Sequence, residues 1–259
     1  MEFCSSNFIN TITGITVNSN TNTASNLLTR DETQQYVSDG LSTDGTISTL
    51  HFPFSSTQSV SRIGLMGLNW KDFTIFYNGV TANTFAFTTT AATTTSDFSS
   101  NSETGMFFFT TPVNCTSVSI NISHTQVANS EKAIGYIYIG NQLLDFARIP
   151  SSQNYKPQIN PKQIVHNMAE GSTRTHSIDE KFSTTIKLTN CDATFRNSLR
   201  TLHRQRTPLG FVDFPTSTGW NVIFYEVVWP GKFDGYNFSD DAAAAGFDVN
   251  MDLRERTRV

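Results

Sequence analysis

The sequence predicts a mainly β protein with two β-domains and one α-helix in the second domain. Three observations support this prediction. Apolar and polar residues alternate over many short segments, which is the period of a strand with one buried face. Clusters of glycine, asparagine, aspartate and threonine separate these segments, as the turns of antiparallel sheets require. One segment has helical spacing instead, and one proline-rich stretch divides the chain.

The composition indicates a folded, polar and weakly charged protein. Its 259 residues suffice for one large or two ordinary domains, and 37% of them are hydrophobic. Charged residues make up only 15%, whereas phenylalanine alone contributes 21 residues, far more than a disordered chain carries. The formal net charge of -4 gives no general attraction to nucleic acid or to an anionic membrane.

The first predicted domain covers residues 1–146 and consists of strands. Alternation is clearest in "TSVSINIS", where Val118, Ile120 and Ile122 share one face. Further candidate strands are "SRIGLMGL", "DFTIFYN", "TFAFTT", "MFFFTT" and "AIGYIYIG". The low-complexity stretch "TTTAATTTS" is expected to be a surface loop between two of them.

A linker is predicted at residues 147–163, because three of the eight prolines fall there among serines and asparagines. The second predicted domain, residues 164–259, has candidate strands in "FSTTIKLT", "VIFYEVVW" and "FDVNMDL". Between them the spacing predicts a helix near 193–206, with Phe195, Leu199 and Leu202 on one stripe. Either Asn190 or Asp192 can cap its start, and a proline follows its end.

The cysteines and the N-terminus predict a protein that is made in a cytosol. Cys4, Cys115 and Cys191 are far apart and odd in number, and no Cys/His cluster occurs, so neither a disulfide framework nor a zinc site is expected. The first residues lack the charged and apolar regions of a signal peptide. No apolar run is long enough to cross a bilayer, so no membrane insertion is expected.

A search for catalytic motifs finds no nucleophile elbow, P-loop, dinucleotide fingerprint, zinc-protease motif or EF-hand loop. The five histidines are scattered without metal-ligand spacing. We therefore expect no catalytic residues, no metal and no cofactor. The alternative is a glycan-active enzyme that uses a pair of carboxylates from the set Asp39, Asp44, Asp72 and Asp97.

The turn Asn69-Trp70-Lys71, together with Tyr36 and Asp39, is a candidate contact for a glycan or a protein. An exposed aromatic ring can stack on a sugar while amide, cationic and carboxylate groups bind its hydroxyls. In the alternative interpretation, Trp70 folds back and closes the end of a sandwich.

Arginines recur along the predicted helix, on the face opposite its apolar stripe. Their planar guanidinium groups suit a subunit interface, whereas the alternative is an ordinary solvated helix face. The candidate interface residues are Arg196, Arg200, Arg204 and Arg206.

Residues 24–146 resemble the discoidin or galactose-binding-like jelly roll. The stretch begins with "NLL", and a V-x-x-I-x-L-x-G-x-N strand leads to a second strand that ends in a tyrosine. The matching residues are Val60, Ile63, Leu65, Gly67, Asn69 and Tyr77. The resemblance implies a jelly-roll β-sandwich in which the turn at Asn69 is a corner of the sandwich and, by extension from the family, a ligand contact.

The whole arrangement also resembles tail-tip and baseplate proteins of tailed bacteriophages, in particular distal tail proteins. The resemblance is carried by the stretch from "IPSSQNYKPQ" to "FSTTIKLT", the helix, "GWNVIFYEVVWPGKFDG" and "GFDVNMDLRE". It implies a tail-tube-like second domain that forms a homo-oligomeric ring around the tail channel, with other phage tail proteins as partners. It also implies a location in the virion tail, with the first domain contacting other tail proteins or host-surface glycans. The weakly negative net charge separately predicts no specific nucleic-acid binding.

These inferences lead to one hypothesis and one alternative. The hypothesis is a non-enzymatic structural component of a phage tail tip. The alternative is a free carbohydrate-binding module or adhesin without a ring-forming role.

Overall fold

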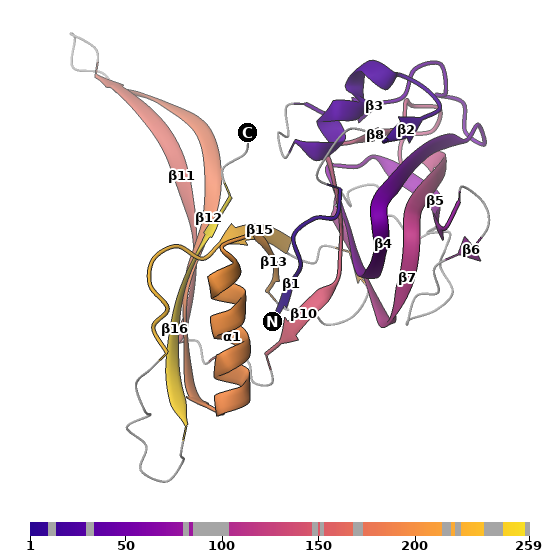
Figure 1. Cartoon of the computed structure of the whole chain (residues 1–259). Coiled ribbons are helices and arrows are strands. Elements are labelled where there is room, and N and C mark those ends of the chain that lie inside the picture. The colour runs from indigo at the N-terminus through magenta and orange to yellow at the C-terminus, as the bar shows by residue number, and fades with distance from the viewer. Residues whose placement is uncertain are drawn as a thin grey trace. The chain divides into compact units, whose positions relative to one another are not determined.

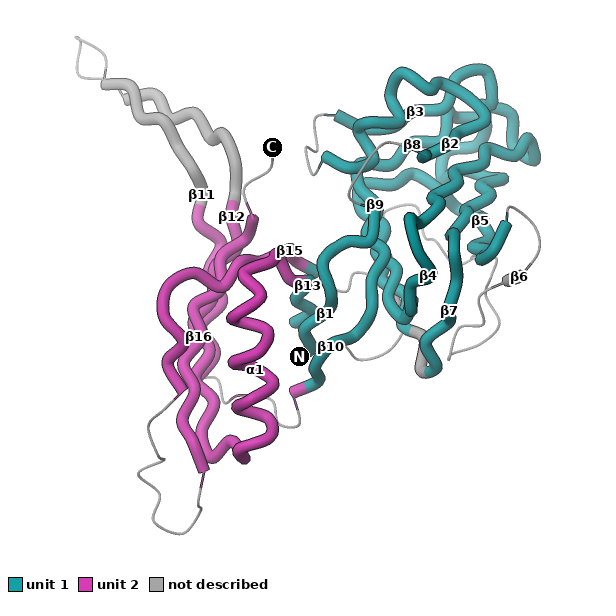
Figure 2. Tube along the Cα trace, viewed as in Figure 1, with its two compact units in different colours: residues 1–145, 210–224, 258–259 teal, residues 146–209, 225–257 magenta. Residues whose placement is uncertain are grey.

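Antiparallel strands dominate the computed structural model of this chain (Figure 1), which confirms the prediction of a mainly β protein. The structure describes residues 1–9, 14–29, 34–79, 83–84, 104–146, 150, 153–167, 173–213, 219–220, 224–235 and 246–256. The chain divides into two units (Figure 2): unit 1 comprises residues 1–145, 210–224 and 258–259, and unit 2 comprises residues 146–209 and 225–257.

Two long strands, β4 (Ser48–Met66) and β7 (Thr104–Thr125), pair with each other and organise unit 1. Their antiparallel register is interrupted twice: after Pro53, where residues 54–57 of β4 stand opposite Thr116 alone, and between Val60 and Arg62, where β7 has the extra residues. Extra residues in one strand of a pair bend it and increase its twist. The two halves of each strand therefore belong to two different sheets.

The two sheets of unit 1 share these bent strands. The first has the order β2 (Thr16–Val17), β4, β7, β5 (Trp70–Tyr77) and β6 (Asn83–Thr84). In the second, β9 (Tyr136–Gly140) pairs with the end of β4, and β14 (Gly219–Trp220) pairs with the start of β7. Two shorter elements accompany them: a 3-10 helix (Thr21–Leu28), and β3 (Tyr36–Val37) paired with β8 (Ala133–Ile134). This is the jelly-roll β-sandwich that the sequence predicts.

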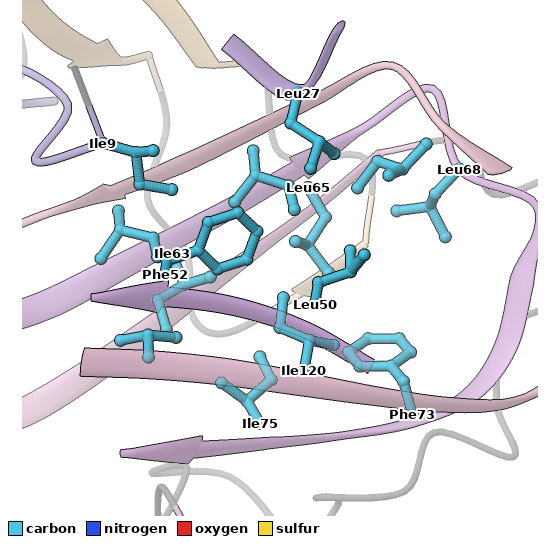
Figure 3. Close-up of a cluster of buried hydrophobic side chains, with 14 of the residues drawn as sticks. Ile9, Leu27, Leu50, Phe52, Ile63, Leu65, Leu68, Phe73, Ile75 and Ile120 are labelled. Carbon is cyan, nitrogen blue, oxygen red and sulfur yellow. The ribbon is translucent and has the colours of Figure 1, made fainter. Parts of the chain in front are cut away.

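The main core lies between the two sheets and collects the inward-facing residues of both (Figure 3). Strand β9 shows how the layers are arranged, because all of its residues are buried. Its isoleucines Ile137 and Ile139 belong to the main core, whereas Tyr136 and Tyr138 belong to a second cluster. The second sheet is therefore covered on both faces, which explains the continuous apolar run in this strand.

A third layer of short strands supplies the partners of that second cluster. Its order is β10 (Gln142–Asp145), β1 (Glu2–Cys4) and β13 (Leu209–Val212). Cys4 and Val212 pack against Phe108 and Tyr138 of the second sheet. Residues 210–224 join the N-terminal residues in unit 1, so the chain returns to this unit after the helix.

A buried ion pair ties the third layer to the sandwich. The Arg62 guanidinium, on β4, donates from Nε to Glu2 Oε1 (2.6 Å) and from Nη2 to Glu2 Oε2 (2.7 Å). The same guanidinium lies 4.7 Å from the centre of the Phe108 ring, and Gln142 donates a further hydrogen bond to Glu2. Both charged side chains are buried, so each depends on the other for compensation.

Unit 2 is a sheet with a helix on one face (Figure 1). The strand order is β15 (Phe224–Val228), β16 (Phe247–Glu255), β12 (Thr173–Cys191) and β11 (Tyr155–Asn167). Helix α1 (Ala193–Gln205) confirms the predicted helix, and Asp192, not Asn190, caps it by accepting a hydrogen bond from Phe195 N at 2.7 Å. Its buried residues include Leu199 and Leu202.

The structure differs from the predicted linker at residues 155–163, which belong to strand β11. The prolines in this stretch favoured a linker over a strand in the sequence analysis. Pro157 and Pro161 are nevertheless compatible with β11, because it is an edge strand of its sheet. The division between the units follows Asp145.

Replacing one partner of the buried ion pair is expected to destabilise the protein strongly. Glu2→Met or Arg62→Met alone should lower the free energy of unfolding by about 3–5 kcal/mol, because the remaining charge is buried without compensation. The double variant should recover most of that loss. Urea unfolding in a double-mutant cycle measures this. The Lys187–Asp248 pair (3.6 Å), whose lysine is half-exposed, is the control, with an expected coupling below about 1 kcal/mol. Equal effects in both cycles would contradict the prediction.

Candidate functional site

Three loops meet at one end of the first sheet, where β4 begins, β5 begins and β7 ends. We call residues 38–47, 67–72 and 123–132 the rim. Backbone hydrogen bonds join its loops: Gly45 N donates to Ser123 O (3.0 Å), and Gln126 N donates to Asn69 O (2.8 Å). The rim contains most of the residues that the sequence singled out as candidate ligand contacts.

Asn69 is a structural residue of the rim. Its Nδ2 donates to Glu131 O (2.8 Å), and its Oδ1 accepts from Ala133 N (2.9 Å). Its backbone N also donates to Ala133 O (3.2 Å). The side-chain amide thereby fastens the 67–72 loop to the segment before β8. The preceding turn needs a glycine, because Gly67 has a φ of 64° and lies close to the backbone of Gly135.

A buried lysine holds the 38–47 loop. Lys132 is fully buried, and its ammonium group donates to the backbone carbonyls of Leu41 and Thr43. Burial lowers the pKa of Lys132, although the nearby carboxylates of Asp44 and Glu131 favour its charged form. The carbonyls satisfy the ammonium and fix the path of the loop.

Both predicted aromatic contacts lie inside the protein. Tyr36 is fully buried, and its hydroxyl donates to Ser19 O at 3.0 Å. Trp70 is also fully buried and packs edge-on against Phe73, with ring centres 5.5 Å apart. Neither ring is accessible for stacking on a sugar, and Trp70 closes the end of the sandwich, as the alternative interpretation states.

An irregularity in β5 explains why Trp70 points inward. The register between β5 and β7 shifts on both sides of Asp72. Trp70 and Phe73 are therefore both buried, although residues three apart would lie on opposite faces of a regular strand. The same irregularity leaves Lys71 exposed. Strict alternation cannot predict this, since a bulge changes which residues face the core.

The accessible side chains of the rim are mostly polar. Asp39 and Lys71 are exposed, and Asp72 Oδ2 lies 3.0 Å from Nδ1 of the half-exposed His124. Ile47 and Val127 are 49% and 73% exposed. Sequence reasoning missed His124, Ile47 and Val127, because only the tertiary structure brings their loops together.

The carboxylates proposed for a glycan-active enzyme are only partly placed by the structure. Asp44 lies on the rim, where its Oδ1 is 3.4 Å from Thr125 N, and Asp39 and Asp72 are there too. Asp97 lies outside the described residues. Within the described ranges no three His, Cys, Asp or Glu side chains are placed to hold a metal ion.

The four arginines of the predicted interface have different environments. The Arg196 guanidinium lies 3.9 Å from the centre of the Phe247 ring of β16, and Arg200 is partly buried. Arg204 and Arg206 are exposed, and Arg206 Nη1 donates to Gly231 O (3.0 Å). The first two therefore flank the buried stripe of α1 rather than lying opposite it. An interface role for the exposed pair stays a prediction.

A shallow pocket lies at the C-terminal end of α1, between the helix and the end of β15. Its lining includes Leu202, Arg206 and the buried His203, whose ring packs edge-on against Trp229 with centres 4.9 Å apart. His203 Nε2 lies 3.2 Å from Gly231 O. Burial, together with the charge of Arg206, lowers the pKa of His203.

Comparisons with known proteins found likenesses of fold only. Neither a protein-family model nor a curated protein matches the sequence. A solved structure of chitosan-binding module 1 from the chitosanase/glucanase of Paenibacillus sp. IK-5 is 16% identical, with a TM-score of 0.39, covering 52% of this chain and 98% of that one. A Clostridium perfringens protein titled CpGH89CBM32-6 is 16% identical, with a TM-score of 0.38, covering 49% and 91%.

A fucolectin from the serum of striped bass (Morone saxatilis) is 12% identical, with a TM-score of 0.38, covering 98% of this chain and 94% of that one. At these identities and TM-scores the likenesses assign neither a family nor an activity. No α-helix among the described residues has the length and apolar character that spanning a bilayer requires.

Removing the Asn69 side chain is expected to destabilise the rim. Asn69→Ala should lower the free energy of unfolding by about 2–3 kcal/mol, because a backbone N–H and a backbone carbonyl lose their partners. Urea unfolding measures the effect. Asn197→Ala, on the exposed side of α1, is the control and should change stability by no more than about 0.5 kcal/mol. A loss as small as that of the control would contradict the structural role of Asn69.

The lowered pKa of His203 predicts a loss of stability in acid. The folded-state pKa lies below the unfolded value near 6.5, so stability is fully present above that pH and falls as the pH drops through the folded-state pKa. His203→Gln should reduce the difference in unfolding free energy between pH 7.5 and pH 5. Urea titrations of both proteins at the two pH values test this, and an unchanged difference would contradict it.

Proposed function

We propose that unit 1 is a non-enzymatic glycan-binding module and that the rim is its binding surface. The observation that carries this proposal is the presence of exposed polar side chains and of two exposed large apolar ones, Ile47 and Val127, on rim loops that are held in place. Asn69 and the buried Lys132 supply the restraint. A site whose supporting residues are fixed before the ligand arrives loses less entropy on binding.

The chemistry of the rim suits a polyol. Sugar hydroxyls both donate and accept hydrogen bonds, and the rim offers carboxylate acceptors at Asp39 and Asp72 and a cationic donor at Lys71. Ile47 and Val127 provide apolar surface for the C–H groups of a sugar ring. The glycan is recognised through hydrogen bonds and aliphatic contacts, because the rings of Tyr36 and Trp70 are buried.

The tail-tip role stays a prediction. The ring around a tail channel, the other phage tail proteins as partners and the virion location rest on the resemblance of the sequence. Nothing in the described part of the chain, and none of the likenesses above, bears on them. Glycan binding by unit 1 is compatible both with a free adhesin and with a tail protein that contacts host-surface glycans.

Glycan binding is tested with the full chain on a glycan array, followed by calorimetry on the glycans that bind. The double variant Lys71→Ala/Asp72→Asn is expected to weaken binding at least tenfold, because it removes a donor and an acceptor from the rim. The control variant, Lys156→Ala/Asp252→Asn, makes the same changes at exposed positions of unit 2 and should bind like the parent protein.

Two outcomes would overturn the proposal. One is a folded parent protein that binds no glycan on the array. The other is binding that the rim variant and the unit 2 variant retain equally. Trp70→Ala is not a diagnostic variant here, since the loss of a fully buried ring tests stability rather than ligand contact.

A further inference from the structure

Strand β11 forms an edge of the sheet in unit 2. Among the described residues it pairs with β12 and with no other strand, and residues 156–160 are all exposed. An exposed edge presents unpaired backbone N–H and C=O groups, which can pair with a strand of another molecule. Whether this edge can bind a strand therefore depends on which residues point their backbone N–H and C=O away from β12.

One backbone hydrogen bond between β12 and the residue before β11 settles which backbone groups of β11 point away from the sheet. Lys187 N, on β12, donates to Asn154 O at 2.8 Å, so the backbone N–H and C=O of Asn154 point toward β12. Backbone groups alternate along a strand, and the register from Tyr155 to Pro161 has no interruption. The residues whose backbone groups point away from β12 are consequently Tyr155, Pro157, Ile159 and Pro161. We call these the outward positions.

Prolines occupy two of these four outward positions, and neither can donate a hydrogen bond. They stand on both sides of Ile159, whose side chain is 60% exposed. In a two-fold antiparallel pairing of two β11 edges about Ile159, Pro157 of one copy would stand opposite Pro161 of the other. Both bonds of each such residue pair would be missing, so from Pro157 to Pro161 only the bonds at Ile159 would remain.

We propose that Pro157 and Pro161 close the β11 edge to strand addition by a second copy of this chain. An exposed apolar residue on an open edge favours association, and flanking residues that cannot extend the ladder counteract it. A direct consequence concerns assembly: copies of this chain that associate do so through surfaces other than pairing of their β11 edges.

The test restores the missing donors. The full-length variant Pro157→Thr/Pro161→Thr regains both N–H groups at positions where a β-branched residue suits a strand. Sedimentation velocity over a range of concentrations is expected to show a dimer whose dissociation constant is at least tenfold lower than any self-association of the parent protein. The control Gln158→Thr/Asn160→Thr changes residues whose N–H groups face β12, and it should behave like the parent.

Disulfide trapping identifies the pairing itself. With Ile159→Cys added to the proline variant, two-fold pairing brings the two new thiols face to face, so oxidation should crosslink the dimer. The native cysteines Cys4, Cys115 and Cys191 are buried and do not compete. The same Cys in the parent background should crosslink much less.

Three results would overturn the proposal. They are a folded proline variant that sediments like the parent at every concentration, equal association of the control, and equal crosslinking in both backgrounds. Circular dichroism establishes that the variants are folded. If the double variant fails to fold, the single variants Pro157→Ala and Pro161→Ala carry the same test, since each restores one N–H.

Discussion

The pairing of β4 with β7 is the constraint on which the rest of unit 1 depends. The two breaks in their register, after Pro53 and after Val60, let two strands serve two sheets. Without the bend, the apolar faces of β4 would lie in one plane and could not enclose the core residues Leu50 and Ile63 between two sheets. The sandwich therefore depends on these local irregularities.

The same strands determine where the rim lies. The loop before β4 and the loop after β7 meet at one end of the first sheet, and the bulge at the start of β5 directs Trp70 inward and Lys71 outward. Polar side chains then have two separate roles. Asn69 and Lys132 hold the loops, whereas Lys71 is exposed and Asp72 lies beside the half-exposed His124. This division supports binding by a rigid surface rather than by a flexible one.

In unit 2, too, some polar side chains support the fold and others lie at the surface. The guanidinium of Arg196 covers Phe247 and so contributes to packing, while Arg204 and Arg206 remain at the surface. The edge strand of the same sheet carries prolines where an open edge would attract another strand. Both units thus combine side chains that hold the structure together with side chains that lie at its surface.

The sequence by itself determined the features that depend on near neighbours in the chain. Helix α1 was predictable, because its apolar stripe and its two candidate caps are local, and strands such as β16 were predictable from alternation. Tertiary structure alone decided the burial of Tyr36 and Trp70, the pairing of His124 with Asp72, and the strand at residues 155–163. The physical reason is that bulges, edge positions and contacts between distant loops depend on which strands become neighbours, and residue patterns along a single chain do not carry that information.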